Sequence, residues 1–337
     1  MTGASVVFEA RGNAVLKACD VPEPGADEVL LESAYSVVSA GTERANLLGL
    51  PNTGTGENGF PYVPGYCGAG RVVAAGPAVT RLKIGDRVII AWGGHCSHVV
   101  KKAEAVLKIE DDSIDLLEAA FAHIASFAFL GVRKLKIELG EPAMVAGMGI
   151  LGAFAVQIAN LSGAMPLLVA DFDPVRRDLA LRLGATAALS PGEADFIKKV
   201  KAAAGGDGPR AVVEVTGSAA ALQQALEYVA WEGRISLLGC TRVSDVPIDF
   251  YNYVHRRGVS LIGAHTFTRA KQESAPGRWT EHDDYRTFLK LVKAGKLQVR
   301  PLISEIVTPD MAPAVYARLA DNPHPPLGIV FDWRNFR

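Results

Sequence analysis

The segment from Ala143 to Asp171 limits the folds open to this chain more than any other part of it. An apolar strand leads into a turn that contains Gly147, Gly149 and Gly152, an apolar helix follows, and a second strand ends on Asp171. In such a turn the first glycine permits a tight bend, the second lets a ligand approach the backbone, and the third lets the helix pack closely. The pattern predicts a doubly wound parallel sheet that binds a dinucleotide at this turn, and an ordinary glycine-rich turn is the alternative.

The helix after the turn and the acid after the second strand indicate how the dinucleotide is held. The N–H groups at the start of the helix, at Ile150 and Leu151, can bind a pyrophosphate together with the three glycines. Asp171 is placed to accept hydrogen bonds from the adenosine ribose, and its charge repels a 2′-phosphate, so we expect NAD(H) rather than NADP(H). Arg176 and Arg177 follow closely. They can stack on the adenine, hold a phosphate or begin a solvated helix.

Composition excludes several classes of partner. The chain of 337 residues has 35 Lys and Arg against 36 Asp and Glu, a formal charge of −1, so we expect neither a nucleic-acid nor a membrane partner. Its four cysteines show no paired spacing, which is typical of reduced thiols. The sequence starts without a signal pattern, and no apolar run approaches the length of a membrane span. We therefore expect a cytoplasmic protein that acts on a small-molecule substrate.

Two kinds of pattern divide the chain into two domains. Up to about residue 125, short apolar runs are broken by Gly and Pro, which predicts a small antiparallel β barrel. Strands and helices then alternate to about residue 263, which predicts an α/β domain with a parallel sheet. We expect a first domain of residues 1–127 completed by residues 267–337, and a dinucleotide-binding domain of residues 128–266. The cleft between the domains is the expected active site.

Several motifs carry a family resemblance that covers nearly the whole chain. They are residues 61–89, which end in a GDRVI motif, the glycine turn with Asp171, and residues 181–186, 212–222 and 232–239. On these residues the chain resembles the medium-chain dehydrogenase/reductase superfamily, above all its zinc-type alcohol and polyol dehydrogenases. The resemblance implies a GroES-like β barrel as catalytic domain, a Rossmann domain in which Thr216 and Gly239 also lie at the cofactor, and a homodimer or homotetramer.

The zinc ligands of that family are replaced in this chain. The positions of the three catalytic ligands fall on Ala40, Tyr66 and His123, and the four-cysteine lobe of a structural zinc is missing. Because a catalytic zinc needs three N, S or O ligands and an open position, we expect no metal. A different zinc site is the alternative, and its candidate ligands are Cys67, His95, Cys96, His98 and His123. This ligand-poor pattern is loosely similar to the branch that contains the bacteriochlorophyllide hydroxyethyl dehydrogenases.

Without zinc, side chains must handle the proton of an alcohol that loses a hydride. The resemblance places four residues at the active site. Tyr66 is expected to hydrogen-bond the substrate oxygen, and His123 to act as the base. Thr42 is expected to pass a proton, and Glu43 to orient His123 or a substrate hydroxyl. Structural interpretations compete with these roles, because Tyr66 can fill the volume of the zinc and His123 can be a core histidine. Thr42 and Glu43 can simply belong to the first turn of a helix.

Three further residues are candidates for substrate contacts. Trp92 follows an apolar strand where the family often has an aromatic pocket wall, and a plain core tryptophan is the alternative. His265 and Trp279 lie in a polar segment, residues 265–285, that faces the cleft in the superfamily. Polar groups around a tryptophan favour a hydroxylated substrate such as a sugar or polyol derivative, whereas a solvated surface loop is the alternative.

The sequence leads to one preferred function and two alternatives. We expect an NAD(H)-dependent enzyme that interconverts a secondary alcohol and its ketone without catalytic zinc. A zinc-free NADPH-dependent quinone or enoyl reductase of the same superfamily is the first alternative, and Asp171 argues against it. An NAD(H)-binding protein without catalysis is the second, because loss of the zinc ligands is also what such decay would produce.

Overall fold

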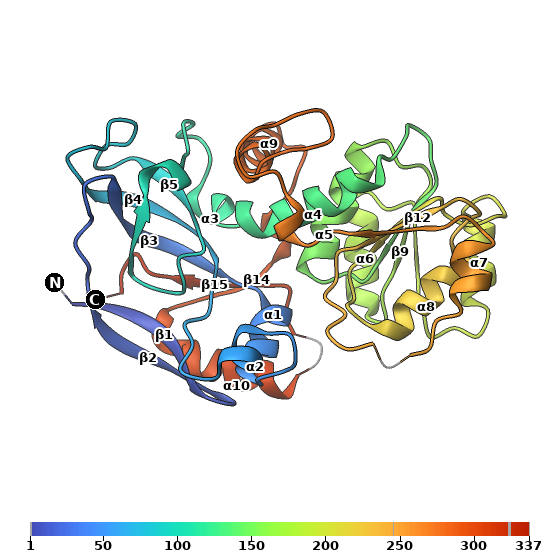
Figure 1. Ribbon diagram of the computed structural model, residues 1–337, viewed down its shortest axis with the longest axis horizontal. Helices are drawn as coiled ribbons and strands as arrows, with labels where there is room; N and C mark the ends of the chain where they lie inside the picture. Colours follow the sequence, from blue (N-terminus) through green and yellow to red (C-terminus); the bar gives the residue numbers. More distant parts are fainter. Residues whose placement is uncertain (1, 245, 323–324, 337) are drawn as a thin grey trace. The chain divides into compact units, whose positions relative to one another are not determined.

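The chain folds into two compact units. The computed structural model describes residues 2–244, 246–322 and 325–336. The first unit contains the residues up to Ile124 and those from Tyr285 onward, and the second unit runs from Ala125 to Asp284 (Figure 1). Helices α4 (Ala122–Leu135) and α9 (Glu281–Lys293) each contain one of the two boundaries.

The second boundary lies further along the chain than the sequence indicated. Residues 267–284, which we expected in the first domain, group with the second unit. Arg269 donates to the backbone oxygen of Ser126 at 2.8 Å, and Asp284 pairs with Arg133 at 2.6 Å. These contacts tie the segment to helix α4 within the second unit.

A mainly antiparallel sheet from both ends of the chain forms the frame of the first unit. Its strand order is β14-β15-β3-β4-β5-β7, with β6 paired to β3, and β1 and β2 form a separate hairpin. Strand β15 runs antiparallel to β3 and parallel to β14. The strands of this unit are β1 (Thr2–Ala10), β2 (Asn13–Asp20), β3 (Glu28–Val38), β4 (Cys67–Ala75), β5 (Arg87–Ala91), β6 (His98–Lys102), β7 (Leu107–Lys108), β14 (Ile303–Val307) and β15 (Gly328–Asp332).

Short helices close this sheet over an aromatic core. They are α1 (Ala40–Leu47), α2 (Gly54–Asn58), α3 (Leu116–Ala119) and α10 (Ala312–Asp321). Phe8, Leu47, Tyr316 and Phe331 are buried in one cluster, in which the rings of Phe8 and Tyr316 meet edge to face at 4.8 Å. The C-terminal helix and strand therefore contribute to the same core as the N-terminal hairpin.

The second unit is a six-stranded parallel sheet in the order β10-β9-β8-β11-β12-β13. The chain starts in the middle at β8, moves to one edge and then crosses to the other, which is the topology of a doubly wound Rossmann sheet and confirms the predicted fold class. Its strands are β8 (Ala143–Ala146), β9 (Leu167–Ala170), β10 (Ala187–Leu189), β11 (Ala211–Glu214), β12 (Arg234–Leu237) and β13 (Ser260–Gly263). Its other α-helices are α5 (Ile150–Leu161), α6 (Pro174–Arg182), α7 (Phe196–Ala203) and α8 (Ala219–Tyr228).

Short 3-10 and π turns complete the two units. The 3-10 helices are η1 (Ala103–Ala105), η3 (Thr266–Thr268), η4 (Arg300–Leu302) and η5 (Pro309–Met311), and η2 (Tyr251–His255) is a π-helix. Across the described ranges, the helices are all too short or too polar to span a bilayer.

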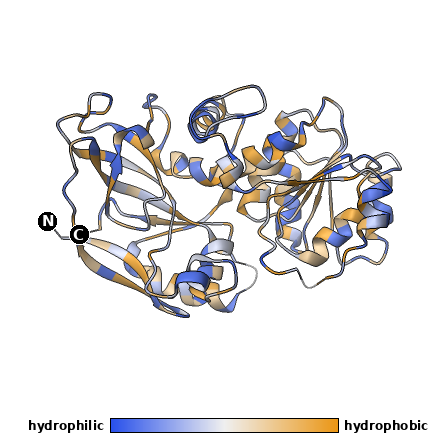
Figure 2. Cartoon of the chain, viewed as in Figure 1, coloured by the Kyte–Doolittle hydropathy of each residue, from blue (hydrophilic) through white to orange (hydrophobic). Residues whose placement is uncertain are grey.

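The central strands of the Rossmann sheet are buried along their whole length. Every residue of β8, β9 and β11 is buried. Hydrophobic segments recur through the second unit in Figure 2. Strands covered by helices on both faces have continuous apolar runs rather than an alternating pattern. This is why the sequence reveals them clearly.

The glycine turn between β8 and α5 depends on the absence of side chains. Gly147 has a φ of +101°, which favours glycine. A Cβ atom on Gly152 would lie 1.9 Å from the backbone oxygen of Gly147, so the first turn of α5 packs directly on the glycine turn. Gly149 has no atom within 4 Å of its ideal Cβ position and a φ of −67°, so its side faces open space.

We predict that Gly152→Ala lowers the free energy of unfolding by about 1–3 kcal/mol, because the new methyl group forces helix α5 away from the turn. Thermal or urea unfolding measures the change. Gly149→Ala is the matched control, and its stability should equal that of the wild type. If both variants were as stable as the wild type, the contact between Gly152 and Gly147 would not be as close as we describe it.

Candidate active site

The start of helix α1 is capped by an acid and not by its N-cap residue. Ser39 occupies the N-cap position, but its side chain makes no capping hydrogen bond. Instead Oε1 of Glu43, four residues further along, accepts from the backbone N–H of Ser39 at 2.8 Å. Thr42 lies inside the first turn and not at the cap. The Ser39 hydroxyl accepts a hydrogen bond from the Tyr66 hydroxyl at 2.5 Å instead.

Glu43 is the centre of a buried polar network behind Ser39. Its side chain is 2% exposed, its Oε2 lies 2.9 Å from Nε2 of His95, and the hydroxyl of Tyr316 donates to the same oxygen. A carboxylate is tolerated in the interior when its oxygens accept several hydrogen bonds. We expected Glu43 to orient His123 or a substrate hydroxyl, whereas its hydrogen bonds go to Ser39, His95 and Tyr316.

Three rings that the sequence assigned to the active site lie together in the first unit. The centroids of Tyr66 and Trp92 are 5.4 Å apart, those of Tyr66 and His123 are 5.7 Å apart, and those of Trp92 and His123 are 4.8 Å apart. The Thr42 side chain hydrogen-bonds Tyr66. Trp92 has a φ of +55°, a conformation that bulky residues rarely adopt outside strained or functional sites.

The Tyr66 hydroxyl stays protonated in this environment. Burial raises the pKa of Tyr66 well above its usual value, and the neighbouring Cys67 adds to the rise. The hydrogen bonds with Ser39 and Thr42 oppose it without cancelling it. Tyr66 can therefore donate or accept hydrogen bonds as a neutral phenol, but it is a poor base.

The other side of His123 meets a residue that the sequence did not single out. His123 is fully buried, and its Nδ1 lies 2.5 Å from the hydroxyl of Tyr285 on helix α9. The two residues are far apart in the sequence and lie on different helices. Only the place of Tyr285 at the end of the polar segment of residues 265–285 pointed to this region, and nothing in its spacing pointed to His123.

The alternative zinc ligands have other partners. Three of the five lie near a serine hydroxyl: His95 near Ser36 at 2.7 Å, Cys96 near Ser5 at 3.1 Å, and His98 near Ser97 at 3.0 Å. Cys67 is buried in β4 between Val37 and Ala91 of the neighbouring strands.

These side chains do not fit a tetrahedral zinc site. Within residues 2–244, 246–322 and 325–336, no group of three His, Cys, Asp or Glu side chains is arranged to hold a metal ion. Of the three family ligand positions, Ala40 has no donor atom and Tyr66 is a protonated phenol bonded to Ser39. Only His123 supplies a good zinc ligand, and a catalytic zinc needs three.

In the second unit, the glycine turn leaves the start of helix α5 open. Gly149 is the N-cap of α5, and a glycine has no side chain with which to cap the N–H groups that follow at Ile150, Leu151 and Gly152. Unpaired N–H groups and the helix dipole at such a terminus attract a phosphate. The open space beside Gly149 is on this turn. The turn can therefore hold a pyrophosphate with its backbone alone.

Asp171 is fixed at the end of β9 by the turn itself. Its Oδ2 accepts from the backbone N–H of Met148 at 2.7 Å, and its Oδ1 accepts from the N–H of Asp173 at 2.9 Å. Arg177 donates to the backbone oxygen of Asp171 at 2.7 Å, whereas Arg176 lies 3.8 Å from Asp173. Of the two arginines, Arg177 is thus the one that is tied to the backbone at the end of β9.

The loops after β11 and β12 meet the glycine turn at the carboxyl ends of the strands. Burial raises the pKa of Glu214, whose carboxylate accepts from the backbone N–H of Thr216 at 2.8 Å and from its hydroxyl. A Cβ on Gly147 would lie 2.9 Å from Thr216, and one on Gly239 would lie 2.4 Å from Gly217. Thr216, Gly239 and the glycine turn therefore line the switch point of the sheet, where dinucleotides bind.

The polar segment before α9 surrounds a small basic pocket in the second unit. The pocket has a volume of about 120 Å³, and Arg133, Arg278 and Trp279 are among its lining residues. The Trp279 ring lies 4.9 Å from the guanidinium of Arg133. His265 is exposed and accepts a hydrogen bond from the N–H of Phe267 at 3.2 Å. His265 and Trp279 stay predictions as substrate contacts.

Family comparisons match both units. Residues 25–128 match the alcohol dehydrogenase GroES-like domain, and residues 151–291 match the zinc-binding dehydrogenase domain.

Two relatives illustrate the similarity at the sequence level. The chain is 29% identical over 264 residues to D-guloside 3-dehydrogenase of Escherichia coli strain K12. The matched region covers 77% of this chain and 74% of the relative. It is 26% identical over 260 residues to sorbitol dehydrogenase of Bacillus subtilis, which covers 68% of this chain and 72% of that relative.

Solved structures share the fold over almost the whole chain. An Escherichia coli oxidoreductase/dehydrogenase of unknown specificity, described as involved in membrane biogenesis, superposes with a TM-score of 0.85 at 19% identity over 98% of this chain and 99% of that chain. A Sinorhizobium meliloti zinc-binding dehydrogenase with bound NADP has a TM-score of 0.82 at 22% identity and the same coverage. With its GroES-like unit, its Rossmann unit and these matches to both, the chain belongs to the medium-chain dehydrogenase/reductase superfamily.

Proposed function

We propose that this protein is an NAD(H)-dependent oxidoreductase that interconverts a secondary alcohol and its ketone without a catalytic zinc. The cluster around Tyr66 supports the proposal most. Tyr66 stands at a zinc-ligand position of the family, bonds to Ser39 and Thr42, and packs against His123. The guloside and sorbitol dehydrogenases among the relatives support chemistry on CH–OH groups.

The side chains of the cluster can handle the proton of such a reaction. The glycine turn would hold the nicotinamide cofactor, which would supply the acceptor or donor for the hydride of the alcohol carbon. In the oxidation direction, the hydroxyl proton of the substrate moves to His123, and in the reduction direction it returns from there. Tyr66 keeps its own proton and hydrogen-bonds the substrate oxygen, because its pKa is raised by burial. Thr42 is half-buried, so it can connect Tyr66 to solvent.

Asp171 supports NAD(H) as the cofactor. Its carboxylate stands at the end of β9 beside the glycine turn, where the adenosine ribose of a bound dinucleotide lies. A 2′-phosphate at that position would be repelled by the carboxylate. Arg176 is the nearby side chain that could offset this repulsion, and it already lies close to Asp173.

The substrate that we propose is a hydroxylated molecule such as a sugar or a polyol derivative. The polar character of the segment with His265 and Trp279 supports this class, and so do the names of the relatives. We also propose that the protein is a homodimer or homotetramer in the cytoplasm. Among the described residues, strand β13 is one of the two edges of the Rossmann sheet, and its outer backbone groups are placed to pair with a further strand.

We predict that the wild type binds NADH at least about tenfold more tightly than NADPH, and that Asp171→Asn narrows this ratio by about tenfold. The amide keeps an oxygen for the N–H of Met148 but loses the charge. Fluorescence titration with both nucleotides measures the ratio. Asp178→Asn, on the exposed side of α6, is the control and should leave it unchanged. Tighter binding of NADPH by the wild type would contradict our choice of cofactor.

We predict that Tyr66→Phe lowers kcat by about 10²-fold and leaves NADH binding unchanged, because the substrate oxygen loses its hydrogen-bonding partner. Tyr62→Phe, which removes a nearby phenol outside the cluster, should keep the wild-type kcat. The assay uses a panel of polyols and sugar ketones in both directions. Elemental analysis of protein purified without chelator accompanies it.

The same experiments separate the alternative functions. Stoichiometric zinc, with activity that a chelator removes and zinc restores, would overturn the zinc-free mechanism. Reduction of an activated C=C bond by NADPH, with alcohols inert, would identify a quinone or enoyl reductase. Tight NADH binding without turnover of any compound in the panel would identify a binding protein.

A further inference from the structure

Tyr285 is placed so that its hydroxyl reaches His123, the imidazole that packs against Tyr66 and Trp92. It lies near the start of α9 and is 1% exposed. Its hydroxyl is 2.5 Å from Nδ1 of His123, and the two rings meet at an angle of 70°. Tyr66, a titratable ring that stays neutral, also faces His123, and Trp92 packs against His123 as well.

A partner on Nδ1 decides how a histidine can act as a base. The two ring nitrogens are distinct, and the hydrogen bond made by one fixes which nitrogen exchanges protons and how the ring is turned. For the ring to take the substrate proton on Nε2, the proton of the neutral ring must stand on Nδ1. The Tyr285 hydroxyl oxygen accepts from Nδ1–H in the neutral ring and again in the imidazolium, so Nε2 remains the nitrogen that exchanges protons.

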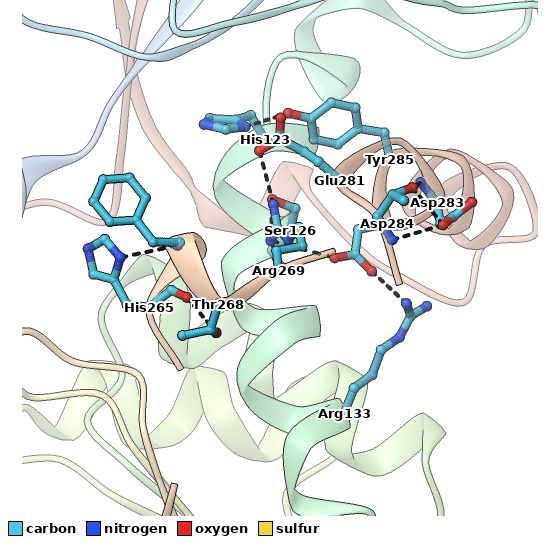
Figure 3. Close-up of polar contacts among 12 residues, drawn as sticks. His123, Ser126, Arg133, His265, Thr268, Arg269, Glu281, Asp283, Asp284 and Tyr285 are labelled. Carbon is cyan, nitrogen blue, oxygen red and sulfur yellow. Dashed lines mark hydrogen bonds and ion pairs between the residues drawn. The ribbon is translucent and has the colours of Figure 1, made fainter. Parts of the chain in front are cut away.

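Ion pairs hold helix α9 at Asp284, the residue before Tyr285. Asp284 is 1% exposed and pairs with Arg133 of α4 at 2.6 Å and with Arg269 at 3.5 Å. Arg269 also pairs with Glu281 at 2.9 Å and donates to the backbone oxygen of Ser126 at 2.8 Å. Figure 3 shows the ion pairs of Asp284 and Arg269 at these two helices, together with His123 and Tyr285.

The ion pairs of Asp284 involve the same two helices that carry His123 and Tyr285. His123 is in the first turn of α4, three residues before Ser126, and Tyr285 directly follows Asp284 on α9. Burial raises the pKa of Asp284 to about 6, while Arg133 and Arg269 oppose the rise, so the carboxylate is ionised and paired above that pH. Each helix is thus anchored within about one turn of the residue that it presents.

We propose that Tyr285 is the positioning residue that sets the ring orientation and the proton-exchanging nitrogen of His123, and that the ion pairs of Asp284 hold Tyr285 in place. The proposal rests on the proposed function, in which His123 is the base. It adds a residue that the zinc-ligand pattern of the family does not contain.

Tyr285→Phe tests the proposal in the full-length protein with NADH bound. The phenylalanine keeps the buried ring but removes the hydroxyl. We expect kcat to fall about tenfold or more, with the affinity for NADH unchanged. Because the imidazolium loses an acceptor, His123 should protonate at a lower pH, and the acidic limb of the kcat profile should move down by about one unit. Tyr228→Phe removes another buried hydroxyl, in the second unit, and should change neither quantity.

NMR of histidine labelled with ¹⁵N provides a readout that does not depend on activity. In the wild type, the Nδ1 signal of His123, assigned with His123→Gln, should show a hydrogen-bonded nitrogen and a titration that Tyr285→Phe shifts to lower pH. Incorporation of 3-fluorotyrosine at position 285 restores a hydroxyl and should restore the wild-type profile. If Tyr285→Phe fails to fold, the wild-type signal still decides whether the hydrogen bond exists.

The outcomes separate the two proposals. If His123→Gln abolishes turnover while Tyr285→Phe matches the wild type in kcat, pH profile and Nδ1 signal, the positioning role is wrong and the proposed function stands. If His123→Gln retains full turnover, the function assigned to His123 is wrong, whatever the NMR signal shows.

Discussion

The arrangement of the first unit depends on the buried carboxylate of Glu43. One oxygen caps helix α1 through the N–H of Ser39, and the other receives Tyr316 and lies against His95. A charge in the interior must be satisfied by several donors, and the loss of one donor leaves a costly group behind. This requirement joins α1, the segment before β6 and helix α10. It also releases the Ser39 hydroxyl from capping, so that Tyr66 can bond to it.

In the zinc-free mechanism that we propose, two groups take the place of the metal. They are a neutral phenol held by two hydroxyl groups and a buried imidazole held by a second phenol. A zinc ion stabilises an alkoxide by charge. Tyr66 and His123 can instead share the proton between hydrogen-bonding groups, provided that both rings are rigidly placed. The packing of Trp92 on both rings and the anchored helices α4 and α9 supply that rigidity.

The second unit uses close backbone contacts where the first uses side chains. Gly152 packs on Gly147, and Asp171 holds the turn through the N–H of Met148. The carboxylate that we propose to bind the ribose therefore also shapes the turn that we propose to bind the pyrophosphate. This double use explains why the turn and the acid form one recognisable pattern in the sequence.

The sequence by itself determined the Rossmann unit, the barrel-like first unit and the loss of the zinc ligands. It could do so because fully buried strands, glycine turns and the absence of donor atoms are local properties of the chain. It also placed Thr42, Tyr66, Trp92 and His123 at one site through their family positions. Only the tertiary structure decided that Glu43 bonds His95 and not His123, that residues 267–284 pack with the second unit, and that Tyr285 meets His123. Those contacts join residues that are distant along the chain, and no local pattern records which buried polar groups will find each other when the helices pack.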